Sequence, residues 1–280
     1  MRREEKNGAQ EIIIEPPQGL FDFDLREVIR YHELLFFLVW RDIRVRYRQT
    51  VLGAIWALLQ PLLTMVVFSV IFGRFAKLPS QGVPYPIFTF SGLLPWQLFS
   101  TALSRSSGSV VSEGRLISKI YFPRLIIPLS SVGAGLIDFG LSFLIYLGLM
   151  AFYSVPLTWK MALLPLFVFI ALLTALSVGL WLSALNVQYR DVRYMIPFMA
   201  TAWMYITPVA YSATIVPERW RVLYGLNPMV GVVEGFRWML LDTPFPDPRM
   251  FAISIAMVVI LLAGGLVYFK RMENYFADVI

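Results

Sequence analysis

Few side chains in this sequence are of the types that perform covalent chemistry. The chain has no cysteine, which excludes thiolate chemistry and disulfides, and its single histidine, His32, argues against a histidine-based metal or acid–base centre. No lysine is followed by serine or threonine, so the phosphate-binding loop of nucleotide hydrolases is missing. The sequence therefore predicts a chain that is not an enzyme and binds no metal or cofactor itself.

Two polar side chains interrupt segments that are otherwise apolar. Asp138 lies near the middle of residues 125–152, where insertion scales put the cost of an ionised carboxylate at about 2.5–3.5 kcal/mol. It is either a polar partner that locks helix packing or a protonated, hydrogen-bonded side chain facing the bundle interior. The second interpretation is favoured because the segment offers no base to relay a proton. Gln60, which precedes Pro61, is open to the same two interpretations.

Aromatic side chains recur at helical spacing and are the candidates for contact with a substrate. An aromatic face accepts the C–H groups of a sugar, and the tips of tyrosine and tryptophan form hydrogen bonds with hydroxyls. The alternative is the ordinary aromatic belt at the membrane interface together with lipid-facing packing. The candidate channel-lining residues are Trp56, Phe68, Phe72, Phe88, Trp96, Phe99, Phe198, Trp203 and Tyr205.

The composition identifies the class of protein that must position these residues. Of the 280 residues 58% are hydrophobic and only 15% are charged, whereas soluble domains are about one quarter charged. The net charge of +6 is explained by basic residues beside apolar segments, so membrane topology is favoured over nucleic-acid binding. Six segments reach the roughly 20 residues that a bilayer-crossing helix needs. They lie at about 51–73, 86–105, 125–152, 162–187, 195–213 and 250–269.

We expect an all-α membrane protein of three parts: a mobile cytoplasmic arm at 1–23, an amphipathic interface helix at 24–48, and a six-helix transmembrane domain at 49–280. A capping box of Asp24 and Glu27 begins the interface helix. The distribution of lysine and arginine between the two sides predicts that both termini are cytoplasmic. The fourth apolar segment carries a small residue at every fourth position, which predicts close helix packing. This stripe consists of Ala171, Ala175, Gly179 and Ser183.

The loop 214–249 has structure of its own. Asn227 followed by Pro228 is typical of a helix start, with asparagine as the cap and proline at the first helical position. The apolar run after it, 229–241, is too short to cross a bilayer, so we expect a re-entrant or surface-lying helix on the outer side. Glu234 and Arg237 are three residues apart and can form an ion pair.

Several motifs occur in the order typical of one family. The entry to the first span, Arg41–Gly53 continuing through Trp56–Pro61, resembles that of permease subunits of ABC type-2 polysaccharide exporters. These proteins move O-antigen, capsular polysaccharide or teichoic acid precursors. The resemblance extends over nearly the whole chain from about residue 25. The other matching motifs are Ser91–Trp96, Lys119–Arg124, Tyr189–Tyr194 and Asn227–Pro228.

The resemblance implies a half-transporter in the bacterial inner membrane that forms a homodimer and pairs with two ATPase subunits, which bind ATP and Mg. The implied cargo is an undecaprenyl-linked polysaccharide, and the motif wording favours O-antigen over capsule or teichoic acid. The implied outer gate comprises Asn227, Glu234 and Arg237. The implied ATPase-coupling residues are Arg41, Arg44, Arg48, Arg115, Lys119, Tyr121 and Arg124.

Three alternatives stay open from the sequence. The first is a small-molecule exporter of the same transporter type. The second is a membrane-bound glycan transferase that uses Asp138 and Glu234. The third is an ATP-independent channel or drug exporter, which would transport without any ATPase partner.

Overall fold

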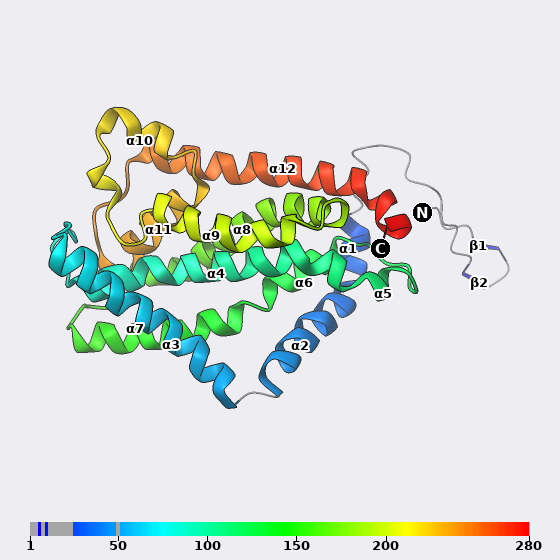
Figure 1. Cartoon of the computed structure of the whole chain (residues 1–280), viewed down its shortest axis with the longest axis horizontal. Coiled ribbons are helices and arrows are strands. Elements are labelled where there is room, and N and C mark those ends of the chain that lie inside the picture. The colour runs from blue at the N-terminus through cyan, green and yellow to red at the C-terminus, as the bar shows by residue number, and fades with distance from the viewer. Residues whose placement is uncertain (1–4, 7–8, 11–24, 49–50, 280) are drawn as a thin grey trace.

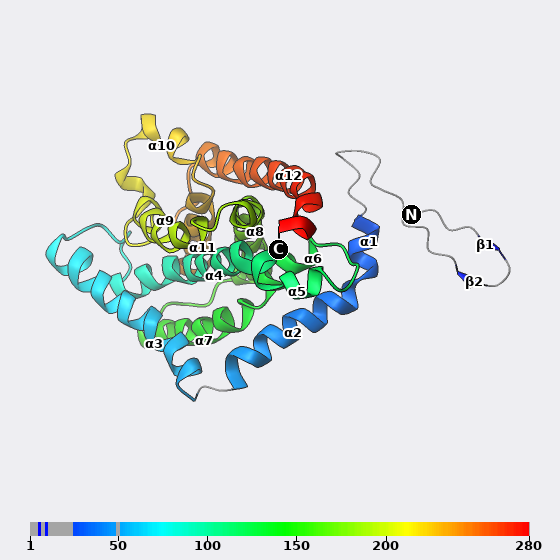
Figure 2. The ribbon, with the colours of Figure 1, turned by 45° about the vertical axis from the view of Figure 1, so that its right-hand side comes forward.

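The computed structural model describes residues 5–6, 9–10, 25–48 and 51–279. The helices form a bundle arranged along one long helix (Figures 1 and 2). This helix, α4 (Tyr85–Ser112), has 28 residues and is about 42 Å long at 1.5 Å per residue. Helix α8 (Leu164–Gln188) packs along α4, and α12 (Pro248–Val279) packs against α8. We name the two ends of the bundle after the residues that end α4. Helix α10 lies at the Tyr85 end, while α1, α5 and the last turns of α12 lie at the Ser112 end (Figure 1).

The remaining elements follow in chain order. Before α4 come two short paired strands and four helical elements: β1 (Glu5–Lys6), β2 (Ala9–Gln10), α1 (Leu25–Arg30), α2 (His32–Arg48), α3 (Val51–Phe68) and the π-helix η1 (Ser69–Phe75). After α4 come α5 (Gly114–Ile117), α6 (Ile126–Gly133), α7 (Leu136–Phe152), η2 (Trp159–Leu163), α8, α9 (Val192–Ile206), η3 (Ala213–Ile215), α10 (Glu218–Tyr224), α11 (Pro228–Leu241) and α12.

Four helical segments of the described chain are long and apolar enough to cross a membrane, by length and composition. They are Leu58–Phe75, Ile126–Phe152, Trp159–Gln188 and Pro248–Glu273. The two further spans that we expected correspond to α4 and α9. Helix α4 is long enough but carries several serines and threonines, and α9 has 15 residues, about 22 Å, against a hydrocarbon core of about 30 Å.

Helix α9 is shorter than the segment predicted at 195–213. It ends at Ile206, and Thr207 has an extended backbone (φ −89°, ψ 143°). The reason is Pro208, because proline disfavours the helical conformation in the residue before it and lacks the N–H that would continue the helix. Residues 207–212 therefore form a non-helical connection between α9 and η3.

Other predicted segments are interrupted where we expected continuous helices. The interface helix predicted at 24–48 consists of α1 and α2 with a turn at Tyr31. The span predicted at 125–152 consists of α6 and α7, joined at Ala134 and Gly135. The capping box of Asp24 and Glu27 and most of the arm at 1–23 lie outside the described residues and side chains.

The packing of α8 against α4 confirms the stripe of small residues. Ala171, Ala175, Gly179 and Ser183 are all buried. A Cβ atom added to Gly179 would lie 2.5 Å from Oγ and 2.8 Å from Cβ of Ser106 on α4. Because only a hydrogen fits at this position, the two backbones approach closely.

Candidate functional site

One side of α4 carries a row of polar side chains that lines two cavities. Ser100, Thr101, Ser104 and Arg105 follow Gln97 by three, four, seven and eight residues along the helix, so the five share one side. Their amides, hydroxyls and guanidinium can donate and accept hydrogen bonds at successive levels. This spacing is visible in the sequence inside the predicted span 86–105, but the candidate residues predicted there were the aromatic ones, and the polar row was missed.

The two cavities adjoin each other. The larger has a volume of about 760 Å³ and lies between α2, α4, α6, α8 and α9. The second, of about 580 Å³, lies between α3, α4 and α9. Both are lined by Arg46, Ser104 and Arg105. The second cavity is also lined by Gln60 and Thr64 of α3 and by Thr201 of α9. The pair therefore forms a polar path beside α4.

Charged residues gather in the larger cavity. Arg41 on α2 forms a bidentate ion pair with Glu113, the residue that follows α4, and a second pair with Asp42 at 2.9 Å. Hydrogen bonding to Glu113 raises the pKa of Arg41 above its ordinary value. Arg105 and Arg193 line the same cavity. The cavity thus combines a basic lining with hydroxyl groups.

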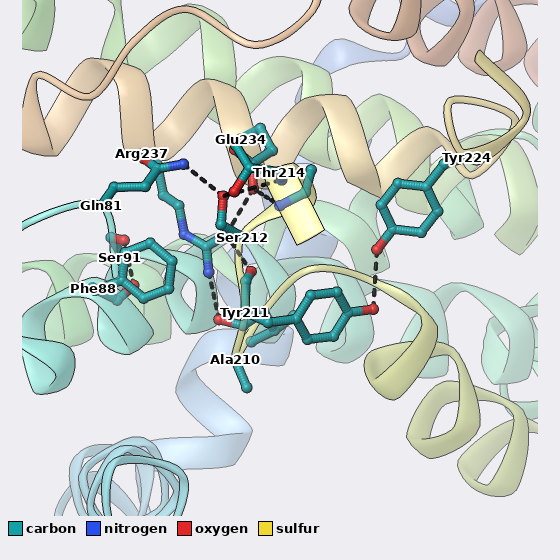
Figure 3. A network of polar contacts seen from close by, with 12 residues as sticks. Gln81, Phe88, Ser91, Ala210, Tyr211, Ser212, Thr214, Tyr224, Glu234 and Arg237 are labelled. Atoms are coloured by element: carbon teal, nitrogen blue, oxygen red, sulfur yellow. Dashed lines mark hydrogen bonds and ion pairs between the residues drawn. The ribbon is translucent and has the colours of Figure 1, made fainter. Parts of the chain in front are cut away.

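A second polar centre lies at the Tyr85 end, on α11 (Figure 3). Arg237 is fully buried and donates hydrogen bonds to Glu234 Oε1 (2.8 Å), to the Tyr211 carbonyl (2.8 Å) and to the Val209 carbonyl (2.6 Å). Its guanidinium lies 3.9 Å from the centroid of the Phe88 ring on α4. The predicted ion pair of Glu234 and Arg237 is therefore confirmed, and it joins α11 to the connection that follows α9.

Asn227 caps α11 as predicted. Its Oδ1 accepts a hydrogen bond from the Met229 N–H (3.1 Å) and another from the Trp203 indole (2.9 Å). Its amide donates to the Thr207 hydroxyl at 3.0 Å. The cap therefore also ties the last turn of α9 to the start of α11. The neighbouring Tyr224 hydroxyl donates to the Ile206 carbonyl at 2.8 Å, and burial raises its pKa above the ordinary value.

Comparison with known proteins identifies the family. The model of the ABC-2 type transporter family matches residues 33–241. The chain belongs to the ABC-2 type transporter family. This ABC-2 chain is 33% identical over 255 residues to the O-antigen export system permease protein RfbA of Myxococcus xanthus, an alignment that covers 90% of the chain and 97% of the relative.

Two further relatives carry related names. An O-antigen export system permease protein RfbA of Klebsiella pneumoniae is 27% identical over 89% of the chain and 95% of its own length. The polysialic acid transport protein KpsM of Escherichia coli is 23% identical over 85% of the chain and 92% of its own length. The ABC-2 chain is thus similar to transport permeases over nearly its whole length.

The structure separates the candidate aromatic residues into three groups. Phe68, Phe88, Trp96 and Phe99 are buried inside the ABC-2 chain, and the Phe99 ring packs against Trp203 with centroids 5.1 Å apart. Trp96 lines the second of the two cavities, and the other three line neither of them. Phe72 and Trp203 are half-buried, while Phe198 and Tyr205 on α9 are exposed. Trp56 lies outside the described side chains. A channel-lining role for the nine stays a prediction.

The predicted ATPase-coupling residues also occupy different environments. Arg115, Lys119 and Tyr121 are exposed around α5 and the loop that follows it. Arg124, in contrast, is half-buried and donates a hydrogen bond to the Glu273 carbonyl of α12. Arg44 is exposed and lies 5.7 Å from the Trp40 ring centroid. Arg41 is engaged with Glu113, and Arg48 lies outside the described side chains.

The carboxylates of the transferase hypothesis do not share a site. Asp138 in the first turn of α7 forms an ion pair with Arg46 of α2 at 2.5 Å, where we had favoured a protonated carboxyl. Glu234 is held by Arg237 on α11. Within the described residues there is no group of three or more histidine, aspartate or glutamate side chains that could hold a metal ion. The two carboxylates named in the transferase hypothesis therefore belong to separate ion pairs, on α7 and α11.

Proposed function

We propose that this chain is the membrane-embedded permease subunit of an ATP-driven exporter of lipid-linked polysaccharide, with O-antigen as the favoured cargo. It works as a homodimer with two separate ATPase subunits in the inner membrane. Similarity to export permeases along the chain supports the class of cargo. The missing phosphate-binding loop in the sequence supports an ATPase supplied by a partner, which also brings ATP and Mg.

The row of polar side chains along α4 is the observation that carries this proposal. A sugar polymer is rich in hydroxyl groups, and each needs hydrogen-bond partners when it leaves water. Gln97, Ser100, Thr101 and Ser104 offer such partners along about two turns of one helix. A hydrogen bond from a sugar hydroxyl to a neutral amide or hydroxyl replaces one to water, so its net binding free energy is small. A polymer bound in this way can advance from one level to the next.

We further propose six membrane crossings with cytoplasmic termini. Helix α4 supplies the second crossing, because most of its serines and threonines are buried or half-buried in the bundle. Helix α9, extended by the connection 207–212, supplies the fifth. Helix α11 is a re-entrant element: its 14 residues span about 21 Å, too little for a crossing, and almost all of them are buried.

Helix α2 is proposed to lie at the cytoplasmic interface. Its exposed side is rich in apolar side chains, with Phe36, Phe37 and Trp40 each more than half exposed, and also carries the exposed Arg44. Its charged residues Arg41 and Arg46 instead pair with groups of the bundle. An apolar outer side is suited to contact with lipid, whereas its exposure to water would be unfavourable.

The loop between α5 and α6 is the proposed docking site of the ATPase subunit. Its exposed residues include Lys119 and Tyr121, and Arg115 is exposed on the adjoining α5. Arg124 anchors the end of this loop to α12 by donating a hydrogen bond to the Glu273 carbonyl. Movement of the docked ATPase would therefore reach α4 through α5, which follows α4 directly.

Filling the polar cavity tests the proposal. Gly108 lines the larger cavity, and an added Cβ meets no atom within 4 Å. Gly108→Trp should therefore block the path without disturbing the packing and reduce polysaccharide export about tenfold or more. Gly148→Trp is the matched control, since Gly148 on α7 is exposed and equally uncrowded. The measurement is surface polysaccharide in cells that lack the native permease and express each variant with its ATPase.

The outcomes separate the proposal from its alternatives. Normal export by Gly108→Trp would remove the cavity from the transport path. Export that persists when the ATPase subunit is absent would favour the ATP-independent channel. A cargo of capsular polysaccharide, teichoic acid precursor or a small molecule would appear as the product missing from the Gly108→Trp cells.

A further inference from the structure

The connection between α9 and η3 is unusual because it is buried without being regular. Thr207, Val209, Ala210 and Ser212 are each at most 6% exposed. Buried peptide groups need hydrogen-bond partners, and a non-helical segment cannot supply all of them itself. The partners must therefore come from elsewhere in the bundle.

Side chains of α4 and α11 supply them at consecutive residues. Arg237 donates to the carbonyls of Val209 and Tyr211, at 2.6 and 2.8 Å. The Tyr85 hydroxyl, at the start of α4, donates to the intervening Ala210 carbonyl. Glu234 accepts from the Ala213 N–H at 3.1 Å. Figure 3 shows Arg237 and Glu234 of α11 beside residues 210–212 of the connection.

The shape of the guanidinium makes arginine the residue that fits at position 237, and a close approach at Gly92 completes the contact with α4. Its planar guanidinium can direct donors from two nitrogens at two carbonyls while its flat face lies against the Phe88 ring, whereas a lysine ammonium is a compact charge without this planar fork. The absence of a side chain at Gly92 brings the connection close to α4. A Cβ added there would lie 2.7 Å from the Val209 carbonyl oxygen and 3.0 Å from an Arg237 nitrogen.

We infer that Arg237 is a positioning residue that clamps the connection 207–212 to α11 beside α4 and so fixes the Ile206 end of α9, a wall of the proposed transport path. Because Arg237 is fully buried, it touches no cargo. It acts through α9, which carries Ala200, Thr201 and Met204 to the cavity beside α4. The role in transport rests on the proposed function, whereas the clamp itself rests on the contacts above.

Thiol labelling tests the clamp without ATP, cargo or partner. The chain has no native cysteine, and Val209 is fully buried, so the smaller cysteine of Val209→Cys fits and should react slowly with a maleimide. The probe is the purified full chain in lipid nanodiscs. In this background Arg237→Lys should raise the labelling rate about tenfold, because the charge-assisted bonds to the two carbonyls are lost.

Gly92→Ala gives a second, independent variant that leaves Arg237 in place. It should raise labelling of Val209→Cys as well, because the added methyl group displaces the Val209 carbonyl. Arg219→Lys is the matched control, since Arg219 is an exposed arginine on α10. Unchanged labelling in both Arg237→Lys and Gly92→Ala would overturn the inference.

Transport measurements then distinguish positioning from a loss of folding. With the ATPase subunit present, Arg237→Lys should leave ATP hydrolysis nearly unchanged while the polysaccharide exported per ATP falls about tenfold. A merely structural role would lower hydrolysis and export together and would overturn the positioning role. If labelling behaves as expected but the unmodified chain exports no polysaccharide, the proposed function fails and the clamp stands.

Discussion

Asp138 and Arg46 show how a charged side chain is accommodated in an apolar segment. Asp138 is in the first turn of α7, where the helix dipole favours an anion, and Arg46 approaches from α2 to within 2.5 Å. The side chains are 16% and 35% exposed, so the attraction is screened less than at a free surface. The pair therefore fastens α2 to α7 as well as supplying a counter-charge.

Removing the charge of Asp138 should destabilise this junction. In Asp138→Asn the half-buried Arg46 loses this anionic partner, so we expect a loss of about 1–2 kcal/mol of unfolding free energy. The measurement is denaturant unfolding of the purified chain in detergent. The control is Glu218→Gln, whose side chain is 89% exposed in its pair with Arg221 and should change stability by less than about 0.5 kcal/mol. Equal effects of the two variants would contradict the role given to Arg46.

Sequence reasoning did not predict the contacts that a side chain makes with residues far away in the sequence. The pair of Glu234 and Arg237 was predictable because the two residues lie on one turn of one helix. The partner of Asp138 was not, because it comes from another helix. For the same reason the spacing of Phe88 and Phe99 gave no sign that both rings are buried in the core of the chain.

Helix α4 relates the two ends of the molecule. Its last residues meet α2 through the pair of Arg41 and Glu113. Its first turns meet the connection 207–212 through Tyr85 and Gly92. One helix about 42 Å long therefore carries the contacts at both ends, without an intervening loop, although Pro95 removes one of its backbone hydrogen bonds.

A single larger side chain at the contact between α8 and α4 should lower the unfolding free energy. Gly179→Val places carbon atoms where Ser106 already lies, and we expect a loss of about 1–3 kcal/mol in unfolding free energy. Adding Ser106→Gly should recover part of the loss by making room, as measured by thermal unfolding of both variants. Gly148→Val is the control, because an added Cβ at Gly148 meets nothing within 4 Å. A loss at Gly148 as large as at Gly179 would indicate a general cost of valine.

At the level of elements the sequence was most informative where local chemistry decides. The Asn227–Pro228 start of α11 was predicted because capping and the fixed φ of proline act within a few residues. The early end of α9 followed from Pro208 in the same local way, but hydrophobicity had outweighed that signal. The breaks that separate α1 from α2 and α6 from α7 were missed, because each pair of helices carries one continuous pattern.

At the scale of the whole molecule, the wall that α9 forms beside the cavities is incomplete in a single chain. Tyr194, Phe198 and Tyr205 share a side of α9, at spacings of four and seven residues, and are 79%, 76% and 57% exposed. Large exposed aromatic side chains that adjoin a polar cavity are typical of a protein interface. Because the same helix contributes Thr201 and Met204 to the cavity, a second copy placed against this side would enclose the polar path.

A charge on this side of α9 should therefore weaken the proposed homodimer. Phe198→Arg puts an arginine into an apolar contact, and we expect the dimer dissociation constant to rise about tenfold or more. The measurement is the mass of the particle in detergent across a range of protein concentrations. Phe152→Arg on α7 is the matched control, because Phe152 is equally exposed at 78% but lies on a helix that does not line the larger cavity. If Phe152→Arg dissociates the dimer while Phe198→Arg does not, the partner binds to α7, and the path beside α4 must be closed by lipid or by another protein.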